Sequence, residues 1–246
     1  MNIQHFTDEN TLASALASRL IAAINQSRRL VLGLPTGRSP LALYRLLAEL
    51  SVRHHVDWSG VRTFNLDEFV GLGGDDAGSY RAFMQSALFD RVGLDPRHVH
   101  LLDGRASDLD LECARYERAI ADAGGIDIQI LGIGANGHIG FNEPAESLRA
   151  QTHVATLQRG TREANAQRFG DDPDRVPARA LSMGMATILA AREIVLIATG
   201  EEKTAAVARL VNGAITTRLP ASFLQLHPRV TVMVDSAAWG VRSPLS

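Results

Sequence analysis

Five short apolar runs rich in β-branched residues divide the chain. They occupy residues 30–34, 61–66, 126–134, 193–199 and 229–235. Runs of this kind are typical of buried strands, and the stretches between them are long enough for the crossover helices that join parallel strands. The pattern predicts an α/β fold in a single domain over residues 1–246. Its sheet should be doubly wound, mostly parallel and Rossmann-like, with helices on both faces.

Between these runs, apolar residues recur every three or four positions, as on one face of a helix. One expected helix has Leu12, Ala15, Leu16 and Leu20 on one face, and a second has Leu41, Tyr44 and Leu47 at three-residue spacing. Two further helical windows are expected, one containing Glu112, Tyr116 and Ile120 and one over residues 204–211. The first helix can be capped by Thr7 or Asp8. The second can be capped by Ser39, with Pro40 in its first turn.

Composition narrows the class of protein. The chain has 246 residues, of which 46% are hydrophobic. Its formal net charge of −2 lacks the positive excess that attracts nucleic acid or an anionic membrane. No run reaches the roughly 18 apolar residues of a membrane span, and the N-terminus lacks the pattern of a secretory signal. We therefore expect a cytoplasmic protein without a nucleic-acid or membrane partner. The single cysteine, Cys113, excludes an intrachain disulfide and fits a buried helical thiol.

Ligands of open α/β sheets bind beyond the carboxyl ends of the strands, so the residues after each run are candidates. The first run leads into Thr36, Gly37, Arg38 and Ser39, just before a helix. A flexible loop with hydroxyl groups, an arginine and a helix N-terminus suits a phosphate group, although an ordinary capped turn has the same composition. Lys203, at the start of the helix after the fourth run, is a candidate for a second phosphate contact.

The second and third runs end in groups suited to proton transfer. Asp67 and Glu68 follow the second run and must point in different directions, so one can act as a general base while the other caps a turn or faces solvent. The third run leads into a glycine-rich loop with His138, a proton carrier near neutral pH, and with Glu143, which can orient the imidazole. No histidine pair has metal-ligand spacing. These strand ends indicate proton transfer on a phosphorylated small molecule.

Six segments, in order along the chain, resemble the glucosamine-6-phosphate deaminase (isomerase) family. They are NLDEFVGL, IGANGHIGFNEP, TREANAQRF, VPARALSMGMATIL, ATGEEK and PASFLQLHP. The GHIGFNEP stretch is specific, because the related 6-phosphogluconolactonases differ after the Gly-His pair. The resemblance implies conversion of glucosamine 6-phosphate and water into fructose 6-phosphate and ammonia, a step of amino-sugar catabolism that uses no metal or organic cofactor.

The resemblance also assigns roles. It implies that His138 assists opening of the pyranose ring with support from Glu143, and that Asp67 moves a proton from C2 to C1 through an enolamine. It implies a mobile lid at about residues 157–177. Asn136 stands where the best-known members have an aspartate in the ring-opening relay. An asparagine can orient the histidine but cannot share its charge, so we expect activity with an altered pH dependence.

The phosphate contacts of the family correspond to residues 36–39 and Lys203. An ungapped match places Gln167 where the family usually has a phosphate-binding arginine. Either a local shift brings in the neighbouring Arg168, or Arg38 takes over this contact.

Allosteric members bind an N-acetylated sugar phosphate through Ser, Arg and Lys residues and a longer C-terminal tail. Here the matching positions hold Glu146, His153 and Ala155, and the chain ends at Ser246. The negative charge of Glu146, with no cation expected nearby, disfavours an anionic effector. We expect the short, non-allosteric branch of the family, acting as a monomer or small homo-oligomer rather than as a hexamer.

Three alternatives remain open at this point. Galactosamine-6-phosphate deaminases share the PASFL segment and one like ATGEEK, and the contact to the C4 hydroxyl cannot be identified from one sequence. A 6-phosphogluconolactonase would have no need of Asp67 as a C2 base. A non-catalytic sugar-phosphate-sensing module on this fold would need a DNA-binding segment, and neither a helix-turn-helix pattern nor a basic patch is evident.

Overall fold

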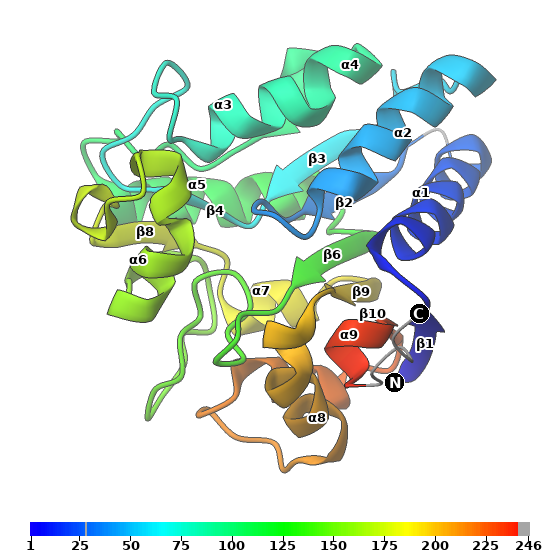
Figure 1. Cartoon of the computed structure of the whole chain (residues 1–246). Coiled ribbons are helices and arrows are strands. Elements are labelled where there is room, and N and C mark those ends of the chain that lie inside the picture. Colours follow the sequence, from blue (N-terminus) through cyan, green and yellow to red (C-terminus); the bar gives the residue numbers. More distant parts are fainter. Residues whose placement is uncertain (28, 241–246) are drawn as a thin grey trace.

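The computed structural model describes residues 1–27 and 29–240, so the chain end at Ser246 lies outside the described residues. Within them, seven strands form one sheet (Figure 1) in the order β1 (Asn2–Phe6), β10 (Val230–Asp235), β9 (Glu193–Ala198), β6 (Ile128–Gly132), β2 (Val31–Leu34), β3 (Arg62–Asn65) and β5 (Val99–His100). Each neighbouring pair in this order is parallel. The predicted doubly wound, parallel α/β fold is confirmed.

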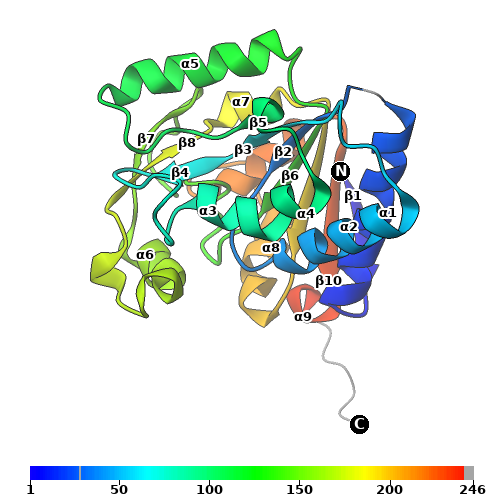
Figure 2. The ribbon, with the colours of Figure 1, turned by 90° about the horizontal axis from the view of Figure 1, so that it is seen from above.

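Helices cover both faces of this sheet (Figure 2). One face is packed by α1 (Glu9–Gln26), α2 (Leu41–His54) and the stretch made of α3 (Tyr80–Met84), the π-helix η1 (Gln85–Phe89) and α4 (Asp90–Val92). The other is packed by α5 (Leu109–Asp122), α7 (Met185–Leu189), α8 (Thr204–Asn212) and α9 (Ser236–Trp239). Cys113 is buried on α5, as expected, and burial raises the pKa of its thiol to about 11. None of the described helices is long and apolar enough to cross a membrane.

The five apolar runs correspond to β2, β3, β6, β9 and β10, which occupy the middle of the sheet. The edge strands β1 and β5 were not predicted. β1 has no fully buried residue, and β5 contains two half-buried residues. An edge strand buries less apolar surface than a central one, so its sequence carries little hydrophobic signal.

The predicted helices form, with corrections at two of them. Asp8 caps α1 by accepting from the backbone N–H of Thr11 at 2.8 Å. Leu12, Leu16 and Leu20 are buried, but Ala15 is exposed, because the buried stripe of α1 runs through the neighbouring positions 13 and 17 instead.

The predicted cap of the second helix was wrong. Helix α2 begins at Leu41, with Pro40 as its N-cap, and none of the described side chains accepts a capping hydrogen bond from the backbone N–H groups of its first turn. The preceding turn is closed by the backbone, where the N–H of Leu41 donates to the carbonyl of Arg38 at 3.1 Å. The predicted buried face was wrong at Leu41, which is 45% exposed, and right at Tyr44 and Leu47.

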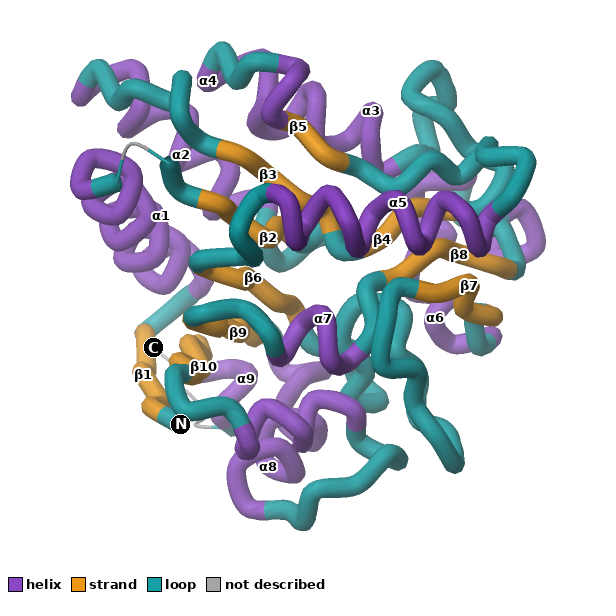
Figure 3. Tube along the Cα trace, turned by 180° about the vertical axis from the view of Figure 1, so that it is seen from behind, coloured by secondary structure: helices purple, strands orange, loops and turns teal. Residues whose placement is uncertain are grey.

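A second, smaller sheet lies beside the first (Figure 3). It pairs β4 (Asp67–Phe69), β8 (Arg179–Ser182) and β7 (His153–Thr156) in antiparallel order. A separate apolar cluster joins this sheet to the segment that holds α6 (Arg159–Asn165) and the short helices η3 (Ala166–Phe169) and η4 (Pro173–Arg175). This sheet was not predicted, because three or four residues per strand leave no periodic pattern.

The order of the strands places a ligand crevice at the centre of the large sheet. From β2 the chain proceeds outward to β3 and β5, then returns to β6 on the other side of β2 and continues outward to β9 and β10. The loops that follow β2 and β6 therefore diverge from adjacent strands. Such a switch point opens a crevice at the carboxyl ends of the strands.

Candidate active site

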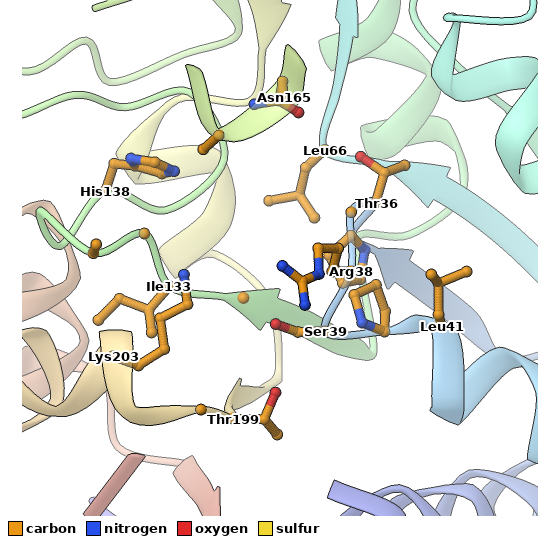
Figure 4. Close-up of a pocket in the computed structure, with 18 of the residues that line it drawn as sticks. Thr36, Arg38, Ser39, Leu41, Leu66, Ile133, His138, Asn165, Thr199 and Lys203 are labelled. Atoms are coloured by element: carbon orange, nitrogen blue, oxygen red, sulfur yellow. The ribbon is translucent and has the colours of Figure 1, made fainter. Parts of the chain in front are cut away.

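A cleft of about 1180 Å³ lies at this switch point (Figure 4). Its walls come from every strand end that the sequence singled out: residues 35–42, Leu66, Asp67, residues 132–136, His138, Gly140, Phe141, residues 199–200, Glu202 and Lys203. The segment that the resemblance predicts to be a lid contributes Gly160, Thr161, Ala164 and Asn165. Most of the predicted site residues are thus brought together in one cavity.

The loop after β2 forms one end of the cleft. Gly37 has a φ of 103°, in the region that favours glycine, so the chain can turn sharply between Thr36 and Arg38. Arg38 and Lys203 extend into the same space from opposite walls (Figure 4). Burial lowers the pKa of Lys203, Glu202 opposes this shift, and the positive charge of Arg38 adds to it. Two cations that approach each other in a partly buried site form a pocket for a dianionic group.

Asp67 lies where the chain leaves the large sheet and enters the small one. Its neighbour Leu66 donates a backbone bond to Leu34 of β2, and Asp67 itself pairs with Ser182 of β8. The side chain lines the cleft, is 7% exposed, and accepts from the hydroxyl of Thr36 at 3.5 Å.

The protonation of Asp67 is unusual for an aspartate. Burial, and then the negative charge of Glu68, raise its pKa to about 7, against smaller lowering effects of Thr36 and Arg168. A carboxylate with this pKa is a strong enough base to remove a carbon-bound proton and still exists in its charged form near neutral pH.

The adjacent Glu68 points elsewhere, as the sequence required. Its carboxylate accepts from the backbone N–H groups of Phe69, Tyr80 and Arg81 at 2.8–3.0 Å, and so closes the N-terminal end of α3. Burial raises the pKa of Glu68 and these hydrogen bonds oppose the shift. The two acids therefore have separate positions, Asp67 in the cleft and Glu68 in the structure behind it.

His138, Asn136 and Glu143 form a relay on the facing wall. Nδ1 of His138 lies 2.8 Å from Oδ1 of Asn136, the Asn136 amide donates to Oε2 of Glu143 at 2.9 Å, and His138 Nδ1 lies 3.6 Å from the same oxygen. Burial opposes ionisation of Glu143, but its contacts with His138, Thr161 and Asn136 outweigh this and lower its pKa. The imidazole is thus oriented by Asn136, beside a carboxylate that stays charged.

Gly134 makes this arrangement possible. A Cβ atom at position 134 would lie 2.2–2.6 Å from the ring atoms of His138, which is closer than any side chain allows. The loop folds back through backbone bonds from Gly134 to His138 and from Gly137 to Gly134, both 2.9 Å. A glycine at 134 lets the ring lie flat against the backbone and face the cleft.

Arg168 is placed differently from the other phosphate candidates. Its guanidinium lies 4.3 Å from the ring centroid of Phe83 and 5.2 Å from that of Tyr80, an arrangement typical of cation–π contacts. Burial lowers the pKa of Arg168, and the neighbouring Tyr80, Glu68 and Asp67 oppose the shift. Gln167 is exposed.

Three further residues of the cleft were missed by the sequence reasoning. Tyr80, Thr161 and Asn165 line it, and the hydroxyl of Tyr80 donates to Oδ1 of Asn165 at 3.1 Å. Thr161 and Asn165 are one helical turn apart on α6, which was a usable signal. Among residues 1–27 and 29–240, no group of three or more His, Cys, Asp or Glu side chains is placed to hold a metal ion.

Comparison with known proteins agrees with this geometry. Residues 7–233 match the family model of glucosamine-6-phosphate isomerases and 6-phosphogluconolactonases. A glucosamine-6-phosphate deaminase from Oceanobacillus iheyensis is 47% identical over 233 residues, which cover 94% of this chain and 93% of that protein.

Two solved structures extend the comparison. A monomeric glucosamine-6-phosphate deaminase superposes with a TM-score of 0.95 at 40% identity, covering 98% of this chain and 100% of the other. A 6-phosphogluconolactonase from Thermotoga maritima superposes with a TM-score of 0.74 at 19% identity over 95% and 99% of the two chains, which shows a shared fold. With identities of 40–47% to deaminases over nearly the whole length, the chain belongs to the glucosamine-6-phosphate deaminase family.

Proposed function

We propose that this protein converts glucosamine 6-phosphate and water into fructose 6-phosphate and ammonia, in the cytoplasm, where phosphorylated sugars are metabolised. The observation that carries the proposal is the placement of Asp67 and His138 in the same cleft as Arg38 and Lys203, the two cations that we propose hold the phosphate. A hexose phosphate held by its phosphate group would present its other end to both groups.

In the proposed mechanism, His138 first moves a proton from the C1 hydroxyl to the ring oxygen, which opens the pyranose. The Asp67 carboxylate then removes the C2 proton while O1 gains a proton from the substrate's own ammonium group, which gives an enolamine. Asp67 returns its proton to C1, which leaves a protonated imine at C2. Water adds to the imine, and ammonia leaves as the C2–N bond breaks. Burial of Asp67 assists the second step, because a poorly solvated carboxylate is the stronger base.

We propose that Arg38, rather than Arg168, supplies the phosphate contact that Gln167 cannot. Arg38→Ala should raise KM for the sugar phosphate and weaken competitive inhibition by inorganic phosphate, each by roughly 10-fold or more, as expected for the loss of a hydrogen bond between charged groups. Steady-state kinetics at several phosphate concentrations would measure both effects.

Arg168→Ala is the matched comparison. Because Arg168 packs against Phe83 and Tyr80, its loss should affect phosphate inhibition less. Because its charge lowers the pKa of Asp67, its loss should raise that pKa in the pH profile of the rate. If Arg168→Ala weakened phosphate inhibition as strongly as Arg38→Ala, Arg168 would be a direct contact and the proposal for Arg38 would need revision.

We propose a monomer or small homo-oligomer without allosteric activation. The expectation that no cation lies near Glu146 was wrong, because Arg218 lies 3.6 Å from its exposed carboxylate, but this pair has no net charge that would attract an anion. Ala155 is buried, and His153 bonds the carbonyl of Gln151. Substrate saturation curves should therefore be hyperbolic and should not change when N-acetylglucosamine 6-phosphate is added below inhibitory concentrations. A sigmoidal curve that becomes hyperbolic with this compound would contradict the prediction.

Ammonia release from glucosamine 6-phosphate and from galactosamine 6-phosphate, measured side by side, tests the proposed function. We expect release from the first substrate with fructose 6-phosphate as the product. Release from the galacto substrate alone would keep the chemistry and change the substrate. Lactone hydrolysis without ammonia release would reverse the proposal in favour of a 6-phosphogluconolactonase.

A further inference from the structure

The relay around His138 has a fourth member that comes from the lid segment. Thr161 of α6 is 3% exposed, lines the cleft, and donates its hydroxyl to Oε1 of Glu143. Asn136 donates to the other oxygen, Oε2. The two oxygens of this carboxylate are thus held by different parts of the chain, one by the loop after β6 and the other by α6.

A second bond ties the same two segments together. The side chain of Gln158, just before α6, donates to the carbonyl of Pro144 at 3.3 Å. The loop that carries Glu143 therefore contacts the start of α6 at two successive residues.

The contact also extends across the cleft. Asn165 donates to the carbonyl of Thr161 at 2.9 Å and accepts from the hydroxyl of Tyr80 at 3.1 Å. Tyr80 belongs to the wall that contains Asp67. One turn of α6 thus bridges the wall of the general base and the wall of the histidine relay, with Asn165 over the cavity opposite the phosphate loop (Figure 4).

We propose that Thr161 is a positioning residue for ring opening: its hydroxyl holds Glu143, and through Asn136 it fixes the orientation of His138, so that the relay is complete only while α6 packs over the cleft. The role rests on the proposed deaminase function and deepens it. A lid that supplies one bond of the relay allows ring opening only when the site is closed.

The physical basis is the cost of an unpaired buried carboxylate. Glu143 is 9% exposed at its side chain, so an oxygen without a donor would either rotate to find one or gain a proton. Rotation would break the bond from Asn136, and protonation would remove the charge beside His138. Helical threonines commonly bond a carbonyl of their own helix, and here the hydroxyl is directed to Glu143 instead.

Thr161→Val tests the role, because it removes the hydroxyl and keeps the side-chain volume. We expect kcat for glucosamine 6-phosphate to fall roughly 10-fold, as for the loss of one hydrogen bond to a charged group, with KM changed less than about threefold. Turnover of 4,5-dideoxyglucosamine 6-phosphate, which lacks both hydroxyls that close a furanose or pyranose and so stays open, should fall by less than about twofold. Thr161→Ser should restore both rates.

The matched control is Glu163→Gln on the same helix, which changes an exposed ion pair with Arg159 and should leave both rates unchanged. A readout without turnover is the pKa of Glu143, followed by 13C NMR of its carboxyl carbon. Removing a hydrogen bond to the charged form raises a carboxyl pKa, so it should rise in Thr161→Val and return to the wild-type value in Thr161→Ser.

Two results would overturn the role of Thr161: an unchanged Glu143 pKa in Thr161→Val, or an equal loss of turnover on both substrates without rescue by Thr161→Ser. If valine disturbs the packing of α6, Thr161→Ala allows the same comparison. Failure of the wild-type protein to release ammonia would remove the proposed function instead, and with it ring opening, whereas the NMR result would still report whether Thr161 holds Glu143.

Discussion

Asp67→Asn should yield a folded protein that still binds sugar phosphate and turns it over at least roughly 10²-fold more slowly, the loss typical of a general base. The amide keeps the shape of the side chain and its contact with Thr36, but it cannot accept the C2 proton. Inhibition by inorganic phosphate should remain within about threefold of wild type. Turnover close to that of the wild-type protein would remove Asp67 from the mechanism.

The pH dependence of the wild-type enzyme provides a second test of the same residue. Because the base must be ionised and its pKa is about 7, kcat/KM should increase with pH up to about 7 and level off above it. With an aspartate of ordinary pKa as the base, kcat/KM would already reach its plateau well below pH 7. Arg168→Ala should move the inflection to higher pH, since the arginine lowers the pKa of Asp67.

The free energy of unfolding should depend on pH, because Asp67 loses its proton less readily in the folded protein than in the unfolded chain. Its folded pKa of about 7 lies above the value of 3.8 expected in the unfolded chain, so between about pH 4 and 7 the folded protein holds a proton that the unfolded chain has released. The contribution of Asp67 to the free energy of unfolding therefore falls as pH rises through this window. Asparagine cannot ionise, so the stability of Asp67→Asn relative to wild type should increase over that window in urea titrations.

His138→Gln should reduce turnover of glucosamine 6-phosphate by roughly 10²-fold or more, because glutamine keeps a hydrogen-bonding side chain but cannot transfer a proton. The loss should be small with 4,5-dideoxyglucosamine 6-phosphate, which can close neither a furanose nor a pyranose and so needs no ring opening. Measuring kcat for both compounds separates a role in ring opening from a role in the later proton transfer. His153→Gln is the matched control, since His153 lies on β7 of the small sheet and bonds the backbone carbonyl of Gln151.

An equal loss on both compounds would assign His138 to a later step and would contradict the ring-opening role. Asn136→Asp is the informative companion variant. It would place a second carboxylate 2.8 Å from His138 Nδ1, at the position of the present amide oxygen. A carboxylate can share the charge of a protonated imidazole, which an amide cannot, so the pH dependence of turnover should differ from that of the wild-type protein.

Much of the sheet could be read from the sequence because its central strands are buried on both faces. Such strands need continuous apolar, β-branched runs, and β2, β6, β9 and β10 have them. The small sheet had no comparable signal, because its strands are short and their pairing is decided by contacts such as Asp67 with Ser182, which lie far apart in the chain. The capping of α2 by Ser39 failed for a related reason: a backbone bond from Leu41 closes that turn.

By itself, the sequence determined which candidate groups follow each strand. They are a loop suited to an anion after β2, two adjacent acids after β3, a histidine after β6 and a lysine after β9. These follow from local composition, since each strand must end where its apolar run ends. Only the tertiary structure decided which groups lie together. Burial at the junction of the two sheets raises the pKa of Asp67, Glu68 is used to close α3, and Asn136 stands between His138 and Glu143. Thr161 joins this relay only because α6 packs over the cleft, a contact between residues 18 positions apart that no local pattern specifies.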